Sequence, residues 1–358
     1  MKVVVDKDIP FLSGVLEPYF KEVVYLSGKD ISPEDVADAC AMVIRTRTKC
    51  NEKLLKGSSV KFIATATIGT DHIDMEYCRR AGIVVKNAAG CNAAGVMQYV
   101  FTALYGVASK KSISLSEGTV LGVIGVGNVG SRVAAMGEYM GFNVLRCDPA
   151  KEKEAGAGAG AGAASYCTLD YLLKNSDIVT LHTDLNPTSR DMAGVEFFRS
   201  MKDGAIFINS SRGEVVQEDA LLASIGKLSA VIIDVWRNEP SINKELMEKV
   251  DIATPHIAGY SYEGKVNGTV MSVRALAGFY DIAPLKTFII EPPEKNTNSF
   301  SKDGLCQTQI AEYFGNIFPI FEHCADLKAH PQNFEQLRSN FKYRREFYVN
   351  STTKTTNC

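Results

Sequence analysis

The chain has 358 residues, of which 46% are hydrophobic and 22% charged, and its formal net charge is −2. This length exceeds what one compact core usually takes, so we expect two or three domains. The balanced charge gives no electrostatic reason to expect nucleic acid or a membrane surface as a partner, and no segment has the apolar length of a membrane-spanning helix.

Met1 leads directly into a short apolar strand, Lys2–Asp6, so no signal peptide is expected. The nine cysteines are scattered and lack Cys-x-x-Cys spacing. We therefore expect no metal site and no disulfide framework, and we place the protein in the reducing cytoplasm.

Short apolar runs then alternate with helix-length segments, which is typical of a parallel α/β fold. In the first part of the chain we expect further strands at Met42–Arg45 and Phe62–Thr65. The apolar stretch Ala93–Ser109 predicts a long buried helix that links this part to a second one.

The second part repeats the alternation. Its expected strands are Thr119–Gly125, Asn143–Cys147, Ile178–His182, Ala205–Asn209, Ala230–Asp234 and Val250–Thr254. A run of alternating Ala and Gly at 155–164 predicts a surface loop without chemistry, and the alternative is that small residues stand there for side chains that were never identified. Glu263–Tyr280 predicts a helix that returns the chain to the first part, Ile282–Ser299 a linker, and the tail to Cys358 a small module of mixed character.

A glycine-rich turn, Gly125-Val-Gly-Asn-Val-Gly130, joins the strand at 119–125 to the helical run Ser131–Met140. Gly125 would allow the tight turn, Gly127 the approach of a diphosphate, and Gly130 the close packing of helix and strand. The start of the helix, with Asn128 and Val129, presents N–H groups to an anion. Alone, this pattern also fits a purely structural turn.

Asp148 strengthens the prediction of a dinucleotide site, because it stands at the end of the next predicted strand, Asn143–Cys147. A carboxylate there accepts hydrogen bonds from the adenosine ribose hydroxyls and repels a 2′-phosphate. We therefore expect NAD as the cofactor, rather than NADP. The alternative is a turn residue before Pro149.

Three more polar residues follow predicted strands: Arg212, Glu239 and His256. An arginine can hold a substrate carboxylate, an imidazole can accept a hydroxyl proton, and a carboxylate can orient that imidazole. Together they suit hydride abstraction from a hydroxy acid. Singly, they fit a surface arginine, a solvated acid and a structural histidine, and His182 also ends a strand. The remaining histidines, which compete for the same role, are His72, His323 and His330.

These segments resemble the D-isomer-specific 2-hydroxyacid dehydrogenases, in the glycine turn, Asn209-Ser-Ser-Arg-Gly213, Asp234-Val-Trp with Glu239-Pro240, and Pro255-His256. The resemblance covers about residues 1–285. It implies two Rossmann-like domains, each a doubly wound parallel sheet, with Arg212, Glu239 and His256 as the catalytic residues.

Finer features resemble one branch of that family, the erythronate-4-phosphate dehydrogenases of vitamin B6 biosynthesis. The most specific is His256-Ile-Ala-Gly-Tyr-Ser-Tyr-Glu-Gly-Lys265. Carried over by position, the branch implies substrate contacts at Thr46, Thr67 and Tyr260, and cofactor contacts at Asp148, Thr183, Asp234 and Gly259. Serine is common in the branch where this chain has Thr46.

The branch also implies an extra C-terminal domain, here α+β and used for dimerisation. The expected domains are then 1–92 with a return helix at about 263–281 as a substrate or lid domain, 93–262 as the NAD-binding domain, and 286–358 for a homodimer contact. Aromatic residues such as Phe314 and Phe347 support that contact, although they could instead fold back onto their own chain.

The expected reaction is NAD-dependent oxidation of 4-phospho-D-erythronate to 2-oxo-3-hydroxy-4-phosphobutanoate. Such a small phosphorylated hydroxy acid needs further cations, and Arg45 and Arg47 flank Thr46 at a strand end, although simple surface charge explains either arginine equally well. The alternatives are a 3-phosphoglycerate or D-lactate type of dehydrogenase, or an NAD(H)-sensing corepressor of the same fold.

Overall fold

The computed structural model describes residues 1–156 and 166–350, which form two compact units. Unit 1 comprises Met1–Asn92 and Ser261–Lys295. Unit 2 comprises Ala93–Tyr260 and the chain from Asn296 onward. Most of the Ala/Gly run at 155–164 lies outside the described residues, so the loop predicted there is not described.

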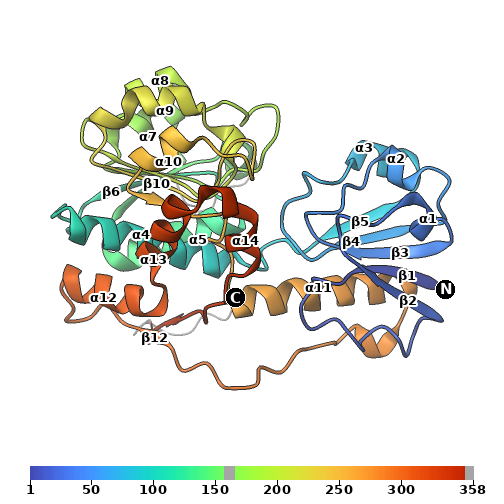
Figure 1. Cartoon of the computed structure of the whole chain (residues 1–358). Coiled ribbons are helices and arrows are strands. Elements are labelled where there is room, and N and C mark those ends of the chain that lie inside the picture. The colour runs from blue at the N-terminus through green and yellow to red at the C-terminus, as the bar shows by residue number, and fades with distance from the viewer. Residues whose placement is uncertain (157–165, 351–358) are drawn as a thin grey trace. The chain divides into compact units, whose positions relative to one another are not determined.

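Unit 1 is built on a five-stranded parallel sheet (Figure 1). Its strands, in spatial order, are β2 (Glu22–Leu26), β1 (Lys2–Asp6), β3 (Ala39–Ile44), β4 (Phe62–Thr65) and β5 (Val84–Asn87). The central strands are mostly apolar, as expected for a parallel sheet with helices on both faces. Val3 and Val5 belong to one buried cluster, whereas Val4 belongs to the cluster on the opposite face.

One long helix and three short ones cover this sheet. The short helices are α1 (Pro33–Val36), α2 (Glu52–Leu55) and α3 (Met75–Arg80). The long helix, α11 (Tyr262–Tyr280), begins where Ser261 Oγ accepts a hydrogen bond from Gly264 N at 3.0 Å. A Cβ atom at Gly268 would lie 2.8 Å from Ala66 O, so only glycine lets α11 pack this closely against the end of β4.

Unit 2 contains a six-stranded parallel sheet. The spatial order is β11 (Ile252–Ala253), β10 (Ala230–Ile233), β9 (Ile206–Asn209), β8 (Ile178–Leu181), β6 (Val120–Ile124) and β7 (Asn143–Cys147). An isolated parallel bridge between Arg146 and Tyr166 extends the β7 edge. The strand order reverses direction between β6 and β8, and ligands of open α/β sheets bind beyond the carboxyl ends of the strands at such a point.

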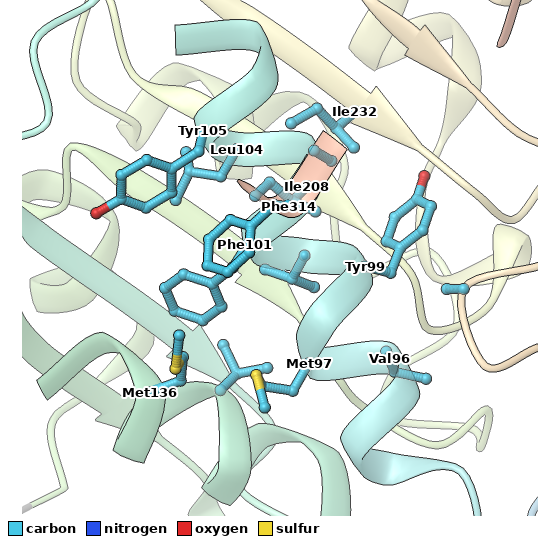
Figure 2. Packing of buried hydrophobic residues seen from close by; sticks show 14 of the residues in the cluster. Val96, Met97, Tyr99, Phe101, Leu104, Tyr105, Met136, Ile208, Ile232 and Phe314 are labelled. Atoms are coloured by element: carbon cyan, nitrogen blue, oxygen red, sulfur yellow. The ribbon is translucent and has the colours of Figure 1, made fainter. Parts of the chain in front are cut away.

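Helices cover both faces of this second sheet (Figure 1). On one face lie α4 (Ala93–Lys110) and α5 (Asn128–Met140), and on the other lie α7 (Leu169–Asn175), α8 (Val195–Ser200), α9 (Glu218–Ser224) and α10 (Lys244–Lys249). Figure 2 shows Met97 and Phe101 of α4 packed with Met136 of α5 and Ile208 of β9. The short helix α6 (Pro149–Gly156) follows β7.

The C-terminal region adds helices and a two-stranded sheet to unit 2. Its elements are β12 (Ser299–Phe300), α12 (Gln307–Ile317), α13 (Ile320–Ala329), α14 (Phe334–Ser339) and β13 (Tyr348–Val349). Phe314 and Phe347 stack with ring centroids 5.3 Å apart and belong to the same buried cluster as α4. These aromatic side chains therefore fold back onto their own chain, whereas Phe321 and Tyr348 stay exposed.

The predicted strands are present, but several are shorter than expected. The predicted strand Val250–Thr254 is reduced to Ile252–Ala253, and the expected linker Ile282–Ser299 contains a short 3₁₀ helix, Ala283–Leu285, and ends where β12 begins. In the described parts of the chain, no helix combines the length and the hydropathy needed to cross a bilayer.

Candidate active site

The glycine turn after β6 has the geometry of a nucleotide-binding loop. Gly125 has a φ of +81°, and a Cβ there would lie 2.7 Å from His182 O. A Cβ at Gly130 would lie 1.9 Å from Gly125 O, so both positions require glycine. At Gly127 a Cβ would meet nothing within 4 Å, which leaves open space in front of the turn.

This open space suits a dinucleotide. Gly127 is the N-cap of α5, whose first residues are Asn128 and Val129, so N–H groups at this helix end can bind a diphosphate. Thr183 lies in the loop after β8, and its buried Oγ1 has no hydrogen-bond partner among the described residues. A buried hydroxyl of this kind needs a partner, and a bound cofactor can supply one.

Asp148 follows β7 and is fixed by backbone N–H groups. Its Oδ2 accepts from Val126 N at 2.9 Å and its Oδ1 from Lys151 N at 3.2 Å. Each carboxylate oxygen can accept a second hydrogen bond. The carboxylate is therefore held beside the glycine turn, where ribose hydroxyls bind in this type of fold.

Asp234 follows β10 and is completely buried. Its Oδ1 accepts from Thr254 Oγ1 at 2.7 Å and Ile257 N at 2.8 Å, and its Oδ2 accepts from Ala258 N at 2.9 Å. Burial raises the pKa of Asp234, and this effect outweighs the charge of His256 and the hydrogen bonds, which both lower it. In this structure Asp234 anchors the loop that carries His256 and Gly259, and its predicted contact with the cofactor stays a prediction.

His256 and Glu239 form a hydrogen-bonded pair. His256 Nδ1 lies 2.8 Å from Glu239 Oε2, and Glu239 Oε1 accepts from Trp236 N at 3.0 Å. Burial opposes ionisation of Glu239, but the charge and hydrogen bond of His256, the Arg338 guanidinium and Trp236 N–H together lower its pKa. The glutamate is thus held as a carboxylate behind an imidazole whose side chain is 29% exposed.

The backbone conformation of His256 fixes this imidazole in the loop after β11. His256 has a φ of +56°, an uncommon conformation for a residue other than glycine. Its N–H donates to Asp234 O at 2.8 Å, which holds the conformation. Backbone strain of this type is frequent at functional sites.

Arg212 follows β9, the strand next to β10. Asn209 holds its turn by donating from Nδ2 to Arg212 O at 3.0 Å, and Arg212 itself donates from Nη1 to Ser211 O at 2.8 Å. A Cβ at Gly213 would lie 2.0 Å from the carbonyl carbon of Trp236, so this turn packs directly on the turn before Glu239. The three predicted catalytic residues therefore follow three adjacent strands at one edge of the sheet.

His182, the competing histidine of unit 2, has different surroundings. Its Nε2 lies 3.0 Å from Thr180 Oγ1, and its Nδ1 is buried without a hydrogen-bond partner among the described residues. Burial lowers its pKa to about 3. This geometry favours His256 over His182 as a base, because His256 has both a carboxylate partner and solvent access.

The residues predicted to bind substrate in the first part of the chain lie at one edge of the unit 1 sheet. Arg45, Thr46 and Arg47 follow β3, and Thr67 follows its neighbour β4. Thr46 and Arg47 are exposed, and Arg45 donates from Nη1 to Asp8 O at 2.8 Å. Thr67 Oγ1 lies 2.8 Å from Thr65 Oγ1. The carboxyl edge of this sheet thus carries hydroxyl and guanidinium groups together.

Residues 254–260 form the loop that carries His256, called the histidine loop below. Its last residue, Tyr260, contacts a residue that the sequence analysis did not identify. Arg338 of α14 donates from Nε to the Tyr260 hydroxyl at 3.1 Å, and its Nη1 lies 3.8 Å from Glu239 Oε2. No local pattern around Arg338 indicates this contact, because its partners are far away in the sequence.

Comparison with known proteins decides the family. Residues 102–258 match the NAD binding domain of D-isomer specific 2-hydroxyacid dehydrogenases. An erythronate-4-phosphate dehydrogenase of Bacteroides fragilis is 44% identical over 355 residues, or 97% of each chain. This chain belongs to the erythronate-4-phosphate dehydrogenase family. The relative from Escherichia coli is 37% identical over 357 residues, which cover 97% of this chain and 92% of that one.

Solved structures agree with the fold. The D-lactate dehydrogenase of Aquifex aeolicus, complexed with NAD and lactic acid, superposes with a TM-score of 0.64 at 27% identity. It covers 82% of this chain and 100% of its own, so this chain contains an additional region. The predicted fold, the resemblance to the family and NAD as the cofactor are confirmed.

Proposed function

We propose that this chain oxidises 4-phospho-D-erythronate at C2 to 2-oxo-3-hydroxy-4-phosphobutanoate, with NAD⁺, in the biosynthesis of pyridoxal 5′-phosphate. The contact between His256 and Glu239 at the carboxyl edge of the unit 2 sheet carries the chemistry of this proposal. The substrate follows from similarity over 97% of the chain to erythronate-4-phosphate dehydrogenases.

The roles of the three catalytic residues follow from their chemistry. Arg212 binds the substrate carboxylate with two parallel hydrogen bonds and so orients C2. His256 accepts the proton of the C2 hydroxyl as a general base. Glu239 fixes the ring through Nδ1 and stabilises the imidazolium that forms.

The cofactor supplies the hydride acceptor when it is bound. Gly125 and Gly130 shape the turn, Gly127 leaves space for a diphosphate, and the N–H groups of Asn128 and Val129 at the start of α5 would bind it. Asp148 would accept hydrogen bonds from the adenosine ribose hydroxyls, and Thr183, Asp234 and Gly259 would contribute further contacts.

Unit 1 supplies the groups for the phosphate end of the substrate. We assign the contact with the phosphate to Arg45 or Arg47. Thr46 and Thr67, and Tyr260 of unit 2, are assigned as further substrate contacts. In terms of domains, residues 1–92 with the return helix serve as a substrate or lid domain, 93–262 as the NAD-binding domain, and 286–358 as a dimerisation domain.

The substrate assignment is tested by measuring NADH formation with 4-phosphoerythronate, 3-phosphoglycerate and D-lactate side by side. We expect kcat/KM to be highest for 4-phosphoerythronate. Arg47→Gln should raise KM for this substrate much more than it lowers kcat, because a phosphate contact acts equally in ground and transition states. Comparable kcat/KM on all three acids would contradict the assignment.

The protein acts as a homodimer in the cytoplasm. The family resemblance supports this proposal more than the aromatic residues of the C-terminal region do, because Phe314 and Phe347 are buried in their own unit. Sedimentation equilibrium of the full chain should give twice the monomer mass. A monomer at micromolar concentration would refute the dimer.

A further inference from the structure

Arg338 reaches the catalytic pair from the C-terminal region. Its Nη1 lies 3.8 Å from Glu239 Oε2, the same oxygen that lies 2.8 Å from His256 Nδ1. Its Nε donates to the Tyr260 hydroxyl at 3.1 Å. One guanidinium therefore contacts the carboxylate that holds His256 and also a tyrosine of the histidine loop.

This contact is part of a fixed structure rather than a chance meeting of surface side chains. The side chains of Arg338 and Glu239 are each only 18% exposed. Phe334, at the start of α14, is completely buried in the core of unit 2. A second arginine of the region, Arg344, donates from Nη2 to Gly95 O at 2.6 Å and to Ala258 O at 3.0 Å. The C-terminal region thus holds the histidine loop at two points.

The charges around the pair give Arg338 an electrostatic effect. Glu335 lies 4.0 Å from its Nη1, and Asp234 is buried beneath the histidine loop. Arg212 follows the neighbouring strand β9. Arg338 and His256 both lie within 4 Å of one carboxylate oxygen, so the guanidinium repels a proton on the imidazole and shares the negative charge of Glu239.

We propose that Arg338 is a positioning residue for the oxidation, which fixes Tyr260 and balances the charge of Glu239 so that His256 stays ready to accept a proton. The proposal rests on the proposed function and gives the C-terminal region a part in catalysis. It involves no contact between Arg338 and the substrate.

The test compares Arg338→Gln with Arg338→Lys and with Lys342→Gln, a matched loss of charge at an exposed side chain nearby. In Arg338→Gln, the acid limb of the pH profile of kcat/KM should move to higher pH by about one unit, because the imidazolium loses a repulsive neighbour. Arg338→Lys keeps the positive charge and should therefore show little of this shift. Lys342→Gln should behave like the unaltered enzyme.

A second measurement needs neither substrate nor turnover. The ring of His256 can be titrated by NMR in the full chain, and its signal identified by its absence in His256→Gln. The midpoint should move to higher pH in Arg338→Gln, and the dispersed spectrum reports that the variant is folded. This result stands even if the natural substrate differs from 4-phosphoerythronate.

Two outcomes would overturn the proposal. An unchanged titration of His256 in folded Arg338→Gln would show that the guanidinium has no influence on the pair. A higher KM for phosphorylated acids alone, with an unchanged titration, would assign Arg338 to the substrate phosphate instead.

Discussion

Two histidines follow strands of the same sheet in unit 2, and their surroundings give them different chemistry. His256 has a carboxylate 2.8 Å from Nδ1 and a side chain 29% exposed. His182 Nε2 is hydrogen-bonded to Thr180 Oγ1, and its Nδ1 is buried. A base needs access to the proton that it takes, so the difference decides between the two residues.

His256→Ala should lower kcat by about 10²–10⁴-fold, the usual effect of removing a general base. The affinity for NAD⁺ should stay near that of the unaltered enzyme, because the glycine turn is untouched. Steady-state kinetics of NADH formation and a cofactor titration measure the two effects. If His182→Ala proves the more damaging change, His256 is not the base.

His182 should also make stability depend on pH. Its pKa is about 3 in the folded protein, below the ordinary value of 6.5, because burial disfavours the charged ring. As the pH falls from about 6.5 toward 3, the unfolded chain binds a proton on this ring and the folded protein does not. The free energy of unfolding therefore decreases over this range.

Between pH 7 and pH 5 this histidine should cost about 1–2 kcal/mol of unfolding free energy. Urea unfolding of His182→Gln should show a correspondingly smaller loss over that interval. His330→Gln, a substitution at an exposed histidine, is the control. Equal pH dependence in both variants would refute the assignment of this effect to His182.

The turn from β6 to α5 contains glycines with two different roles: Gly130 is needed for folding, and Gly127 leaves space for a ligand. A Cβ at Gly130 would collide with Gly125 O, whereas a Cβ at Gly127 would meet no protein atom within 4 Å. Gly130 thus allows the helix to pack on the strand, and Gly127 keeps the space in front of the turn open.

Gly130→Ala should therefore destabilise the protein by more than about 2 kcal/mol, since overpacking forces the backbone to move. Gly127→Ala should change the unfolding free energy by less than about 0.5 kcal/mol, yet weaken NAD⁺ binding at least about tenfold. Chemical unfolding and calorimetric titration separate the effects. Normal NAD⁺ affinity in Gly127→Ala would place the diphosphate elsewhere.

At the scale of the whole molecule, the C-terminal region is part of unit 2 rather than an appendage. Phe314 is completely buried in the cluster that contains Phe101 and Ile208 (Figure 2). Gln98 of α4 donates from Nε2 to Phe347 O at 2.9 Å. The region therefore stabilises the unit that carries the catalytic residues, and it also positions Arg338.

Phe314→Ala should destabilise unit 2 by about 3–5 kcal/mol, the usual effect of truncating a buried phenylalanine. Phe321→Ala, at a side chain 36% exposed, is the matched control and should have a much smaller effect. Scanning calorimetry measures both. If Phe314→Ala only detached the C-terminal region and left the main transition unchanged, that region would be a separate folding unit.

Features that depend on residues close together along the chain could be predicted from the sequence alone. The glycine turn and the polar residues after β9, β10 and β11 could be predicted because strand, turn and helix follow one another along the chain. In parallel sheets the carboxyl ends of the strands meet at one edge, so Arg212, Glu239 and His256 could be expected at the same edge from the sequence. Both edge strands of unit 1, β2 and β5, were missed, and the four residues of β5 carry little apolar pattern.

Contacts between segments that lie far apart along the chain could not be predicted in this way. The burial of His182, the packing of Phe314 against α4 and the approach of Arg338 to Glu239 depend on how helices pack on a sheet, and no local pattern encodes this. The environment of a side chain sets its ionisation and its access to solvent. His182 and His256 both follow strands in the sequence, yet His182 is a buried neutral ring and His256 is accessible and paired with a carboxylate.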